Sequence, residues 1–158
     1  MPSDAAEIVA PSLDLAHFLP YRLSVLTNRV STAIARAYSE RFDLTIPEWR
    51  AMAVLGGTSG LSAGEVAQRT AMDKVQVSRA VARLVDKKRV QRLADREDAR
   101  ISRLSLTAKG RAIYDEIVPL ALALEGVLLD ALSPGERASL DAIVLKLNRQ
   151  ANLLGGVG

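Results

Sequence analysis

Three closely spaced helix starts constrain the fold of this chain more than any other feature. The stretches LTIPEW, LSAGEV and MDKVQV begin at Leu44, Leu61 and Met72, and each places Thr, Ser or Asp three positions before Glu or Gln, with apolar residues on both sides. This is the capping box with its hydrophobic staple, which satisfies otherwise unpaired amides of a first helical turn. We therefore expect short helices over about residues 46–55, 63–69 and 74–88.

The interval between the second and third of these helices is only TAMD, residues 70–73. Four residues allow nothing but a tight turn, so the pair predicts a helix-turn-helix. After it, RVQRLA and ISRLSL alternate apolar and polar residues on either side of DREDAR, which is the pattern of a β-hairpin. Three helices followed by a hairpin form a winged helix-turn-helix.

Long amphipathic helices are expected at both ends of this unit. Apolar residues at three-and-four spacing predict one helix from Pro20 to Phe42. Another should begin after Thr107 and reach about Leu132, with a kink at Pro119, and the last should run from Pro134 to about Leu153. Their wide apolar stripes favour a homodimer, and the residues of the C-terminal stripes are Leu120, Leu124, Val127, Leu128, Leu140, Ile143, Val144, Leu147 and Leu154.

The expected fold class is mainly α, or α+β with a small β-hairpin wing, in which long N- and C-terminal dimerisation helices enclose the winged helix-turn-helix. We divide the chain into a flexible N-terminal tail over 1–18, an N-terminal dimerisation helix over 19–42, a DNA-binding domain over 43–107 and C-terminal dimerisation helices over 108–154.

Composition excludes several classes of protein. Of the 158 residues 49% are hydrophobic but only 4% aromatic, with no Cys and a single His, so disulfides, thiol chemistry and the usual zinc sites are ruled out. No apolar run approaches the roughly 20 residues of a membrane span, and the N-terminus lacks the basic head of a secretory signal. A cytoplasmic protein is expected. The sequence contains no nucleophile elbow, phosphate loop or dinucleotide fingerprint. We therefore expect that the protein is not an enzyme and binds no cofactor.

The charge is distributed unevenly along the chain. Residues 69–111 hold thirteen Lys or Arg against five Asp or Glu, a balance of +8, while the rest holds eight against thirteen, a balance of −5. A basic middle between acidic flanks indicates a polyanionic partner for the middle only.

The third helix of the helix-turn-helix unit is the expected reading helix. Val77, Ala80, Val81, Leu84 and Val85 form its packed face, and its outward residues suit base edges and phosphates, because Arg recognises guanine and Gln recognises adenine. An ordinary solvated helix face is the alternative. The candidate reading residues are Lys74, Gln76, Ser78, Arg79 and Arg83.

Five charges crowd residues 95–100 at the tip of the hairpin. Asp95, Glu97 and Asp98 raise the alternatives of a metal or nuclease site and of a solvated turn. A hard cation needs six or more oxygens arranged in three dimensions, which three carboxylates in four residues do not supply. The third interpretation is that the tip touches a charged partner.

The sequence resembles the MarR family of transcriptional regulators from about Leu19 to Leu147. The resemblance is carried by LTIPEWRAMAVL, LSAGEVAQRT, MDKVQVSRAVARLVDKKRVQR and above all DREDARISRLSLTAKG, which is similar to the DRxDxR wing of the family and its following helix start. It implies a homodimer that binds pseudo-palindromic promoter DNA, acts as a repressor and is released by a small aromatic or anionic ligand.

The resemblance also assigns roles to the wing. Arg96 would enter the minor groove of double-stranded DNA, where narrow A·T tracts attract arginine, with Arg100 as a second wing contact. Asp95 and Asp98 would pair with Arg100 or cap the turn. We expect phosphate contacts from the surrounding basic residues as well, namely Lys87, Lys88, Arg89, Arg92 and Arg103.

One position departs from the family. Where the family commonly has Gly after the reading helix, this chain has Arg89, which must either adopt the left-handed conformation or end the helix differently.

The resemblance also implies a ligand pocket where the first long helix meets the second helix, near His17, Tyr21, Arg22 and Trp49. Arg22 could pair with a carboxylate and Trp49 could stack on an aromatic ring. Trp49 also has a purely structural explanation as the staple partner of Leu44.

Two other functions share these features. One is a non-specific architectural DNA-binding protein, and the other is a winged-helix module used for protein contacts.

Overall fold

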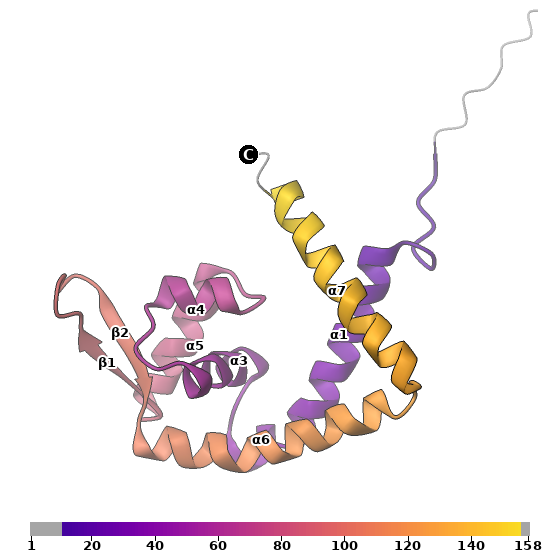
Figure 1. Ribbon diagram of the computed structural model, residues 1–158. Helices are drawn as coiled ribbons and strands as arrows, with labels where there is room; N and C mark the ends of the chain where they lie inside the picture. The colour runs from indigo at the N-terminus through magenta and orange to yellow at the C-terminus, as the bar shows by residue number, and fades with distance from the viewer. Residues whose placement is uncertain (1–10, 156–158) are drawn as a thin grey trace, which may run out of the picture.

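The computed structural model describes residues 11–155, and the expected flexible tail therefore lies largely outside the described residues. The elements run in the order α1 (Leu19–Arg36), α2 (Ser39–Phe42), α3 (Ile46–Gly57), α4 (Ala63–Arg69), α5 (Lys74–Asp86), β1 (Val90–Ala94), β2 (Ser102–Leu106), α6 (Ala108–Leu129) and α7 (Pro134–Gly155). Figure 1 shows α3, α4, α5 and the hairpin gathered into one lobe, and α6 leads from the hairpin to α7.

The helix starts of the lobe are built by the three capping boxes. At α3 the amide of Thr45 donates to Glu48 Oε2 at 2.7 Å, and the amide of Glu48 donates to Thr45 Oγ1 at 3.4 Å. The same reciprocal bonds join Ser62 to Glu65 at α4, and Asp73 to Gln76 at α5. The expected α4 matches the observed helix residue for residue, and the expected fold class is confirmed.

The two strands form an antiparallel wing whose register pairs Val90 with Leu106 and Ala94 with Ser102. A single bridge adds the α3–α4 connection to this sheet, since the amide of Leu104 donates to the carbonyl of Leu61 at 2.8 Å. The wing is therefore fastened to the helix-turn-helix, while its tip extends beyond α3, α4 and α5 (Figure 1).

The hydrophobic core lies inside the lobe. Met52 and Leu55 of α3, Val66 of α4 and Leu84 of α5 are fully buried, and Ile117 closes the core from α6. Of the five apolar positions predicted to form the packed face of α5, Val77, Ala80, Val81 and Leu84 are buried and Val85 is half-buried, so α5 presents its other face to solvent.

The single long helix expected from Pro20 to Phe42 is wrong. α1 ends at Arg36, and Tyr38 has a non-helical φ of −129° before the short α2 begins. The break brings the Tyr38 ring into the core at 1% exposure, with its centroid 5.6 Å from the ring of Trp49.

The end of α5 also differs from the expectation. The helix stops at Asp86, and the left-handed residue is Lys88, with φ of 57°, rather than Arg89. The amides of Lys88 and Arg89 donate to the carbonyls of Val85 and Leu84 at 2.9 and 2.8 Å, which is a Schellman motif. It forms around a lysine here at a cost of about 1–2 kcal/mol for the left-handed conformation.

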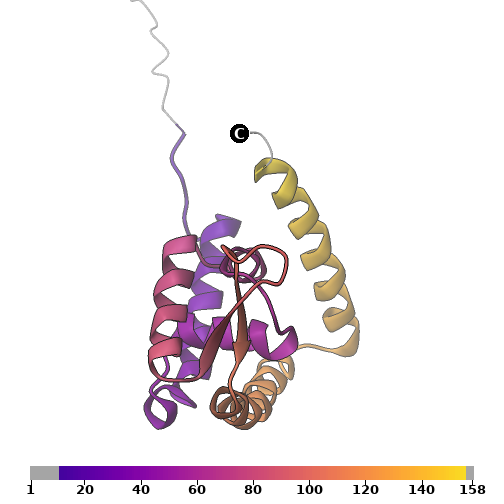
Figure 2. The same ribbon diagram turned by 90° about the vertical axis from the view of Figure 1, so that its left-hand side faces the viewer.

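The terminal helices lie outside the lobe. α6 runs through Pro119 as one helix and ends at Leu129, three residues earlier than expected, and α7 follows after a corner where Arg137 pairs with Asp130 at 3.0 Å. No residue of α1 or α7 is buried. In Figures 1 and 2, α7 stands apart from the lobe.

Over residues 11–155, no single helix has both the length and the apolar character to cross a membrane, although α6 and α7 together, bent by 110°, meet that test on length and composition alone.

Candidate nucleic-acid interface

The solvent face of α5 is polar and basic. All five candidate reading residues are exposed on this helix or its first turn: Lys74, Gln76, Ser78, Arg79 and Arg83. The N-terminus of α5 is capped by Asp73, whose carboxylate accepts the amide of Gln76 at 2.8 Å. A polar helix face of this kind, beside a projecting wing, is able to enter a DNA major groove.

Two of these five residues already have partners within the chain. The side-chain oxygen of Gln76 accepts a hydrogen bond from the Asp73 amide at 3.2 Å, so Gln76 is part of the capping box of α5. Arg83 Nε lies 3.4 Å from Glu48 Oε1, a carboxylate that is completely buried. Lys74 and Arg79 form no ion pair within the described part of the chain, which leaves their charges available to a partner.

The surrounding cations separate into an outward and an inward group. Lys88 and Arg92 are exposed. Lys87 donates instead to the carbonyl of Asp43 at 2.6 Å, and it pairs with the Asp43 carboxylate at 3.0 Å. This pairing, chiefly the hydrogen bond from Lys87, lowers the pKa of Asp43.

Arg89 belongs to the inward group, which corrects the expectation of a phosphate contact. It is only 7% exposed, and its guanidinium donates to the carbonyls of Phe42 and Asp43. In this position it is inaccessible to DNA.

Arg103 is likewise held within the protein, between the wing and α4. Its Nε donates to Asp95 Oδ2 at 2.6 Å and its Nη1 to Glu65 Oε2 at 2.9 Å. It therefore ties the wing to the capping box of α4, where the sequence had indicated a phosphate contact.

The acids of the wing tip hold the shape of the turn. Asp95 Oδ1 accepts the amides of Glu97 and Asp98 at 2.9 and 3.0 Å. Together with the Arg103 hydrogen bond, which has the largest effect, these bonds lower the pKa of Asp95 to about 2. Asp98 pairs with Arg100 Nε at 3.0 Å, and this pairing lowers its pKa too.

This geometry bears on the interpretation of the tip as a metal site. Asp95 and Asp98 have their oxygens committed to amides and arginines, and residues 11–155 hold no group of three His, Asp or Glu arranged for a metal ion. Arg96 is exposed at the tip with no ion-pair partner among the described side chains. Glu97 and Arg100 of the same turn are exposed too, but Arg100 is paired with Asp98.

The residues expected to form one ligand pocket do not come together. Trp49 lines a hollow of about 130 Å³ with Ser31, Ile34, Tyr38, Ile46 and Arg50. Tyr21 and Arg22 line a different hollow along α1, and His17 pairs with Asp14 at 2.7 Å on an exposed turn. The four residues therefore line no common hollow in the described part of the chain.

The hollow beside Trp49 has its own polar groups. Arg50 Nη2 donates to Ser31 Oγ at 3.3 Å, which links α3 to α1. Burial, which outweighs the opposing charge of Arg50, raises the pKa of Tyr38 to about 12, so its hydroxyl stays protonated.

One candidate on the reading helix escaped the sequence analysis. Val75 is 58% exposed between Lys74 and Gln76. An outward apolar side chain in a reading helix can contact the methyl group of thymine. The sequence could have predicted this exposure, because Val75 falls outside the three-and-four spacing of the apolar residues on the packed face.

Known proteins place this arrangement in context. The family model described as the MarR family matches residues 42–101, from the end of α2 to the wing. No curated protein matches the chain in sequence. A MarR/EmrR family transcriptional regulator from Acinetobacter sp. ADP1 is 26% identical with a TM-score of 0.81, and the match covers 89% of this chain and 99% of that chain.

Two further structures have the same fold at lower identity. MepR of S. aureus, solved as a DNA complex, is 20% identical with a TM-score of 0.77 and covers 85% of this chain and 98% of its own. BpsR of Bordetella bronchiseptica, whose DNA binding is regulated by 6-hydroxynicotinic acid, is 22% identical with a TM-score of 0.76 and covers 87% and 98%.

The fold and the solvent face of α5 define a winged-helix protein of the DNA-binding class. More particularly, the chain has the fold of a MarR-family transcriptional regulator, and its resemblance to that family is confirmed.

Proposed function

We propose that the chain is a sequence-specific transcriptional repressor that binds pseudo-palindromic promoter DNA as a homodimer. The observation that carries this proposal is the solvent face of α5, where Lys74, Ser78 and Arg79 lie exposed beside a wing that presents Arg96. Arg79 would read a base edge, Arg96 would enter the minor groove, and Lys88 and Arg92 would contact phosphates.

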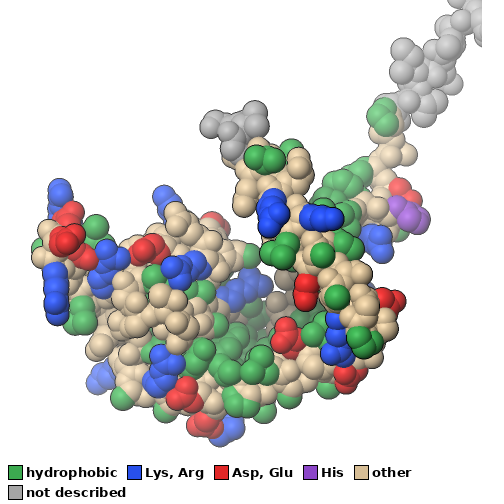
Figure 3. All heavy atoms as spheres, in the orientation of Figure 1, with side chains coloured by type: hydrophobic (Ala, Val, Ile, Leu, Met, Phe, Trp, Pro, Cys, Tyr) green, Lys and Arg blue, Asp and Glu red, His purple; other side chains and the backbone are tan. Residues whose placement is uncertain are grey.

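The homodimer is supported by the apolar side chains of the terminal helices. Leu26, Val127, Ile143 and Leu154 are each more than half exposed. Figure 3 shows such side chains over α1, α6 and α7, while charged side chains gather over the wing. A two-fold axis through these helices would set two reading helices about one DNA turn, or roughly 34 Å, apart.

The test is selection of bound DNA from random sequence, followed by titration of the selected site and of a scrambled duplex at several salt concentrations. The proposal expects two half-sites related by a dyad and a higher affinity for the selected site. Equal affinities and equal salt slopes would favour the architectural DNA-binding protein, because counterion release alone does not distinguish sequences. Absence of DNA binding at low salt would favour the protein-interaction module.

Release by a small aromatic or anionic ligand belongs to the same proposal, with the hollow beside Trp49 as its site. Arg50 supplies a cation and Trp49 an aromatic face. Trp49 is the only tryptophan of the chain, so its fluorescence reports binding directly. Titration with benzoate should change this fluorescence and weaken DNA binding, and Arg50→Gln should abolish both effects. A signal that is unchanged at millimolar benzoate would refute binding of this ligand class in the hollow.

A further inference from the structure

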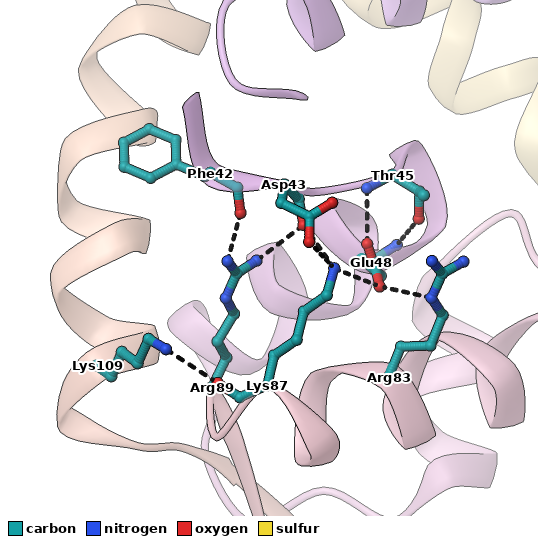
Figure 4. Close-up of polar contacts among 8 residues, drawn as sticks. All are labelled: Phe42, Asp43, Thr45, Glu48, Arg83, Lys87, Arg89 and Lys109. Atoms are coloured by element: carbon teal, nitrogen blue, oxygen red, sulfur yellow. Dashed lines mark hydrogen bonds and ion pairs between the residues drawn. The ribbon is translucent and has the colours of Figure 1, made fainter. Parts of the chain in front are cut away.

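The C-terminal end of the reading helix contains a buried charge that DNA contact does not explain. Arg89 donates through Nη1 to the carbonyl of Asp43 at 3.1 Å and through Nη2 to the carbonyl of Phe42, and its Nε is buried without a partner (Figure 4). Burying a guanidinium is costly unless hydrogen bonds compensate. Its acceptors are carbonyls at the end of α2, which have no partner inside that helix.

A second cation from the same end of α5 reaches the same segment. Lys87 Nζ donates to the carbonyl of Asp43 at 2.6 Å and lies 3.5 Å from Glu48 Oε1. Two side chains that follow the reading helix thus bind the junction between α2 and α3. This junction is connected to α1 through α2. We call Lys87, Arg89 and the carbonyls of Phe42 and Asp43 the Arg89 clasp.

The start of α6 holds the other side of this helix end. The carbonyls of Lys88 and Arg89 accept hydrogen bonds from Thr107, at 2.7 and 3.0 Å, and Lys109 donates to the carbonyl of Lys87 at 3.2 Å. Gly110 permits this approach, because a Cβ there would lie 2.0 Å from the Arg89 carbonyl oxygen. The C-terminal end of α5 is therefore hydrogen-bonded on one side to the α2–α3 junction and on the other side to the start of α6.

We propose that Arg89 is a positioning residue for DNA recognition, which fixes the reading helix relative to the helices that carry the apolar faces. The inference rests on the proposed function, because it concerns the distance between two reading helices of a homodimer. Without the clasp, each reading helix would lose its fixed orientation and the dimer would discriminate less between half-site spacings. Arg89 contributes no phosphate contact of its own.

Salt dependence separates positioning from phosphate contact. Arg89→Met removes the hydrogen bonds but keeps a long side chain, and Arg92→Met is the matched control at an exposed cation on the adjoining strand. We expect Arg89→Met to weaken operator binding about tenfold with an unchanged slope of log affinity against log salt. Loss of one phosphate contact per chain lowers that slope by about 0.9 for each contact, or about 1.8 for a dimer, and this is the result expected for Arg92→Met.

Operators with one base pair added between the half-sites give the second readout. The wild-type protein and Arg92→Met should bind them much more weakly than the native spacing, whereas Arg89→Met should show a smaller penalty. Arg89→Lys, which restores a donor to one carbonyl, should recover part of the spacing preference. A reduced salt slope for Arg89→Met, or a spacing penalty equal to that of the wild type, would overturn the positioning role.

A distance measurement tests the clasp without DNA. The chain has no Cys, so Ser78→Cys places one spin label on each reading helix. Dipolar spectroscopy should give a narrow distance distribution for the otherwise wild-type dimer and for Arg92→Met, a broad one for Arg89→Met, and an intermediate one for Arg89→Lys. Equal widths in all four proteins would refute the clasp while leaving the proposed function standing. Absence of any dipolar signal would refute the homodimer, and the clasp with it.

Discussion

The lobe and the terminal helices differ in whether their apolar side chains are buried within the chain. α5 buries Val77, Ala80, Val81 and Leu84, whereas α1 and α7 bury no residue at all. The lobe completes a hydrophobic core within one chain. The terminal helices expose apolar stripes that a single chain leaves in water, which is the basis of our proposal that a second copy completes their core.

The largest expected effect lies in the core of the lobe. Leu84→Ala should lower the free energy of unfolding by about 2–5 kcal/mol, because it leaves a cavity at a fully buried site. The matched control is Val75→Ala on the same helix, whose exposed side chain should contribute less than about 0.5 kcal/mol. Chemical denaturation of both variants measures the difference. Equal losses would contradict the assignment of the two faces of α5.

Changes to the apolar stripe of α7 should act on assembly. Ile143→Asp combined with Leu147→Asp should weaken dimerisation by about 100-fold or more, since each dimer would bury four carboxylates. The lobe should keep its fold, as judged by near-ultraviolet circular dichroism of Trp49. Ala142→Asp on the opposite face of the helix serves as the control. A double variant that remains dimeric at low micromolar concentration would place the interface elsewhere.

The exposed arginines should affect DNA binding with little effect on stability. Arg79→Ala should cost about 1–3 kcal/mol of DNA-binding free energy at one base position and relax the base preference there. Recovery of the same consensus sequence by this variant would refute the role of Arg79 in base recognition.

Arg96→Ala should weaken operator binding while the melting temperature shifts by no more than about 1–2 °C, as expected for an exposed side chain. Unchanged operator affinity of this variant would refute the role of Arg96 in the minor groove.

The smallest effect is a pH dependence of the wing. The folded-state pKa of Asp95 is lowered to about 2 by Arg103 and two amides. Because the folded pKa lies below the unfolded one, the stabilisation is fully present above about pH 4. It is lost as pH falls towards 2. The difference in melting temperature between the wild type and Asp95→Asn should shrink over this interval, and a constant difference would contradict the pairing.

Local signals in the sequence were sufficient for the lobe. The capping boxes at Thr45, Ser62 and Asp73 act within four residues, and they located the helix starts without tertiary information. The end of the first helix depends instead on tertiary packing. The expected helix is interrupted at Tyr38, whose ring packs against Trp49 in the core.

The inward turn of Arg89 and Arg103 was beyond sequence reasoning. A basic residue near a reading helix has the same local pattern whether it faces DNA or a carbonyl. Arg89 meets acceptors more than 40 residues away, at Phe42 and Asp43, and Arg103 meets Glu65. For the same reason, the four proposed pocket residues could not be assigned to one site from their spacing.

The most direct test of the contrast between the two regions is the molar mass of the full chain, free and bound to its selected operator, by sedimentation equilibrium. The account predicts twice the 17.0 kDa of one chain in free solution, and two chains on each duplex. A free chain of 17.0 kDa that binds the operator singly and with full affinity would contradict it.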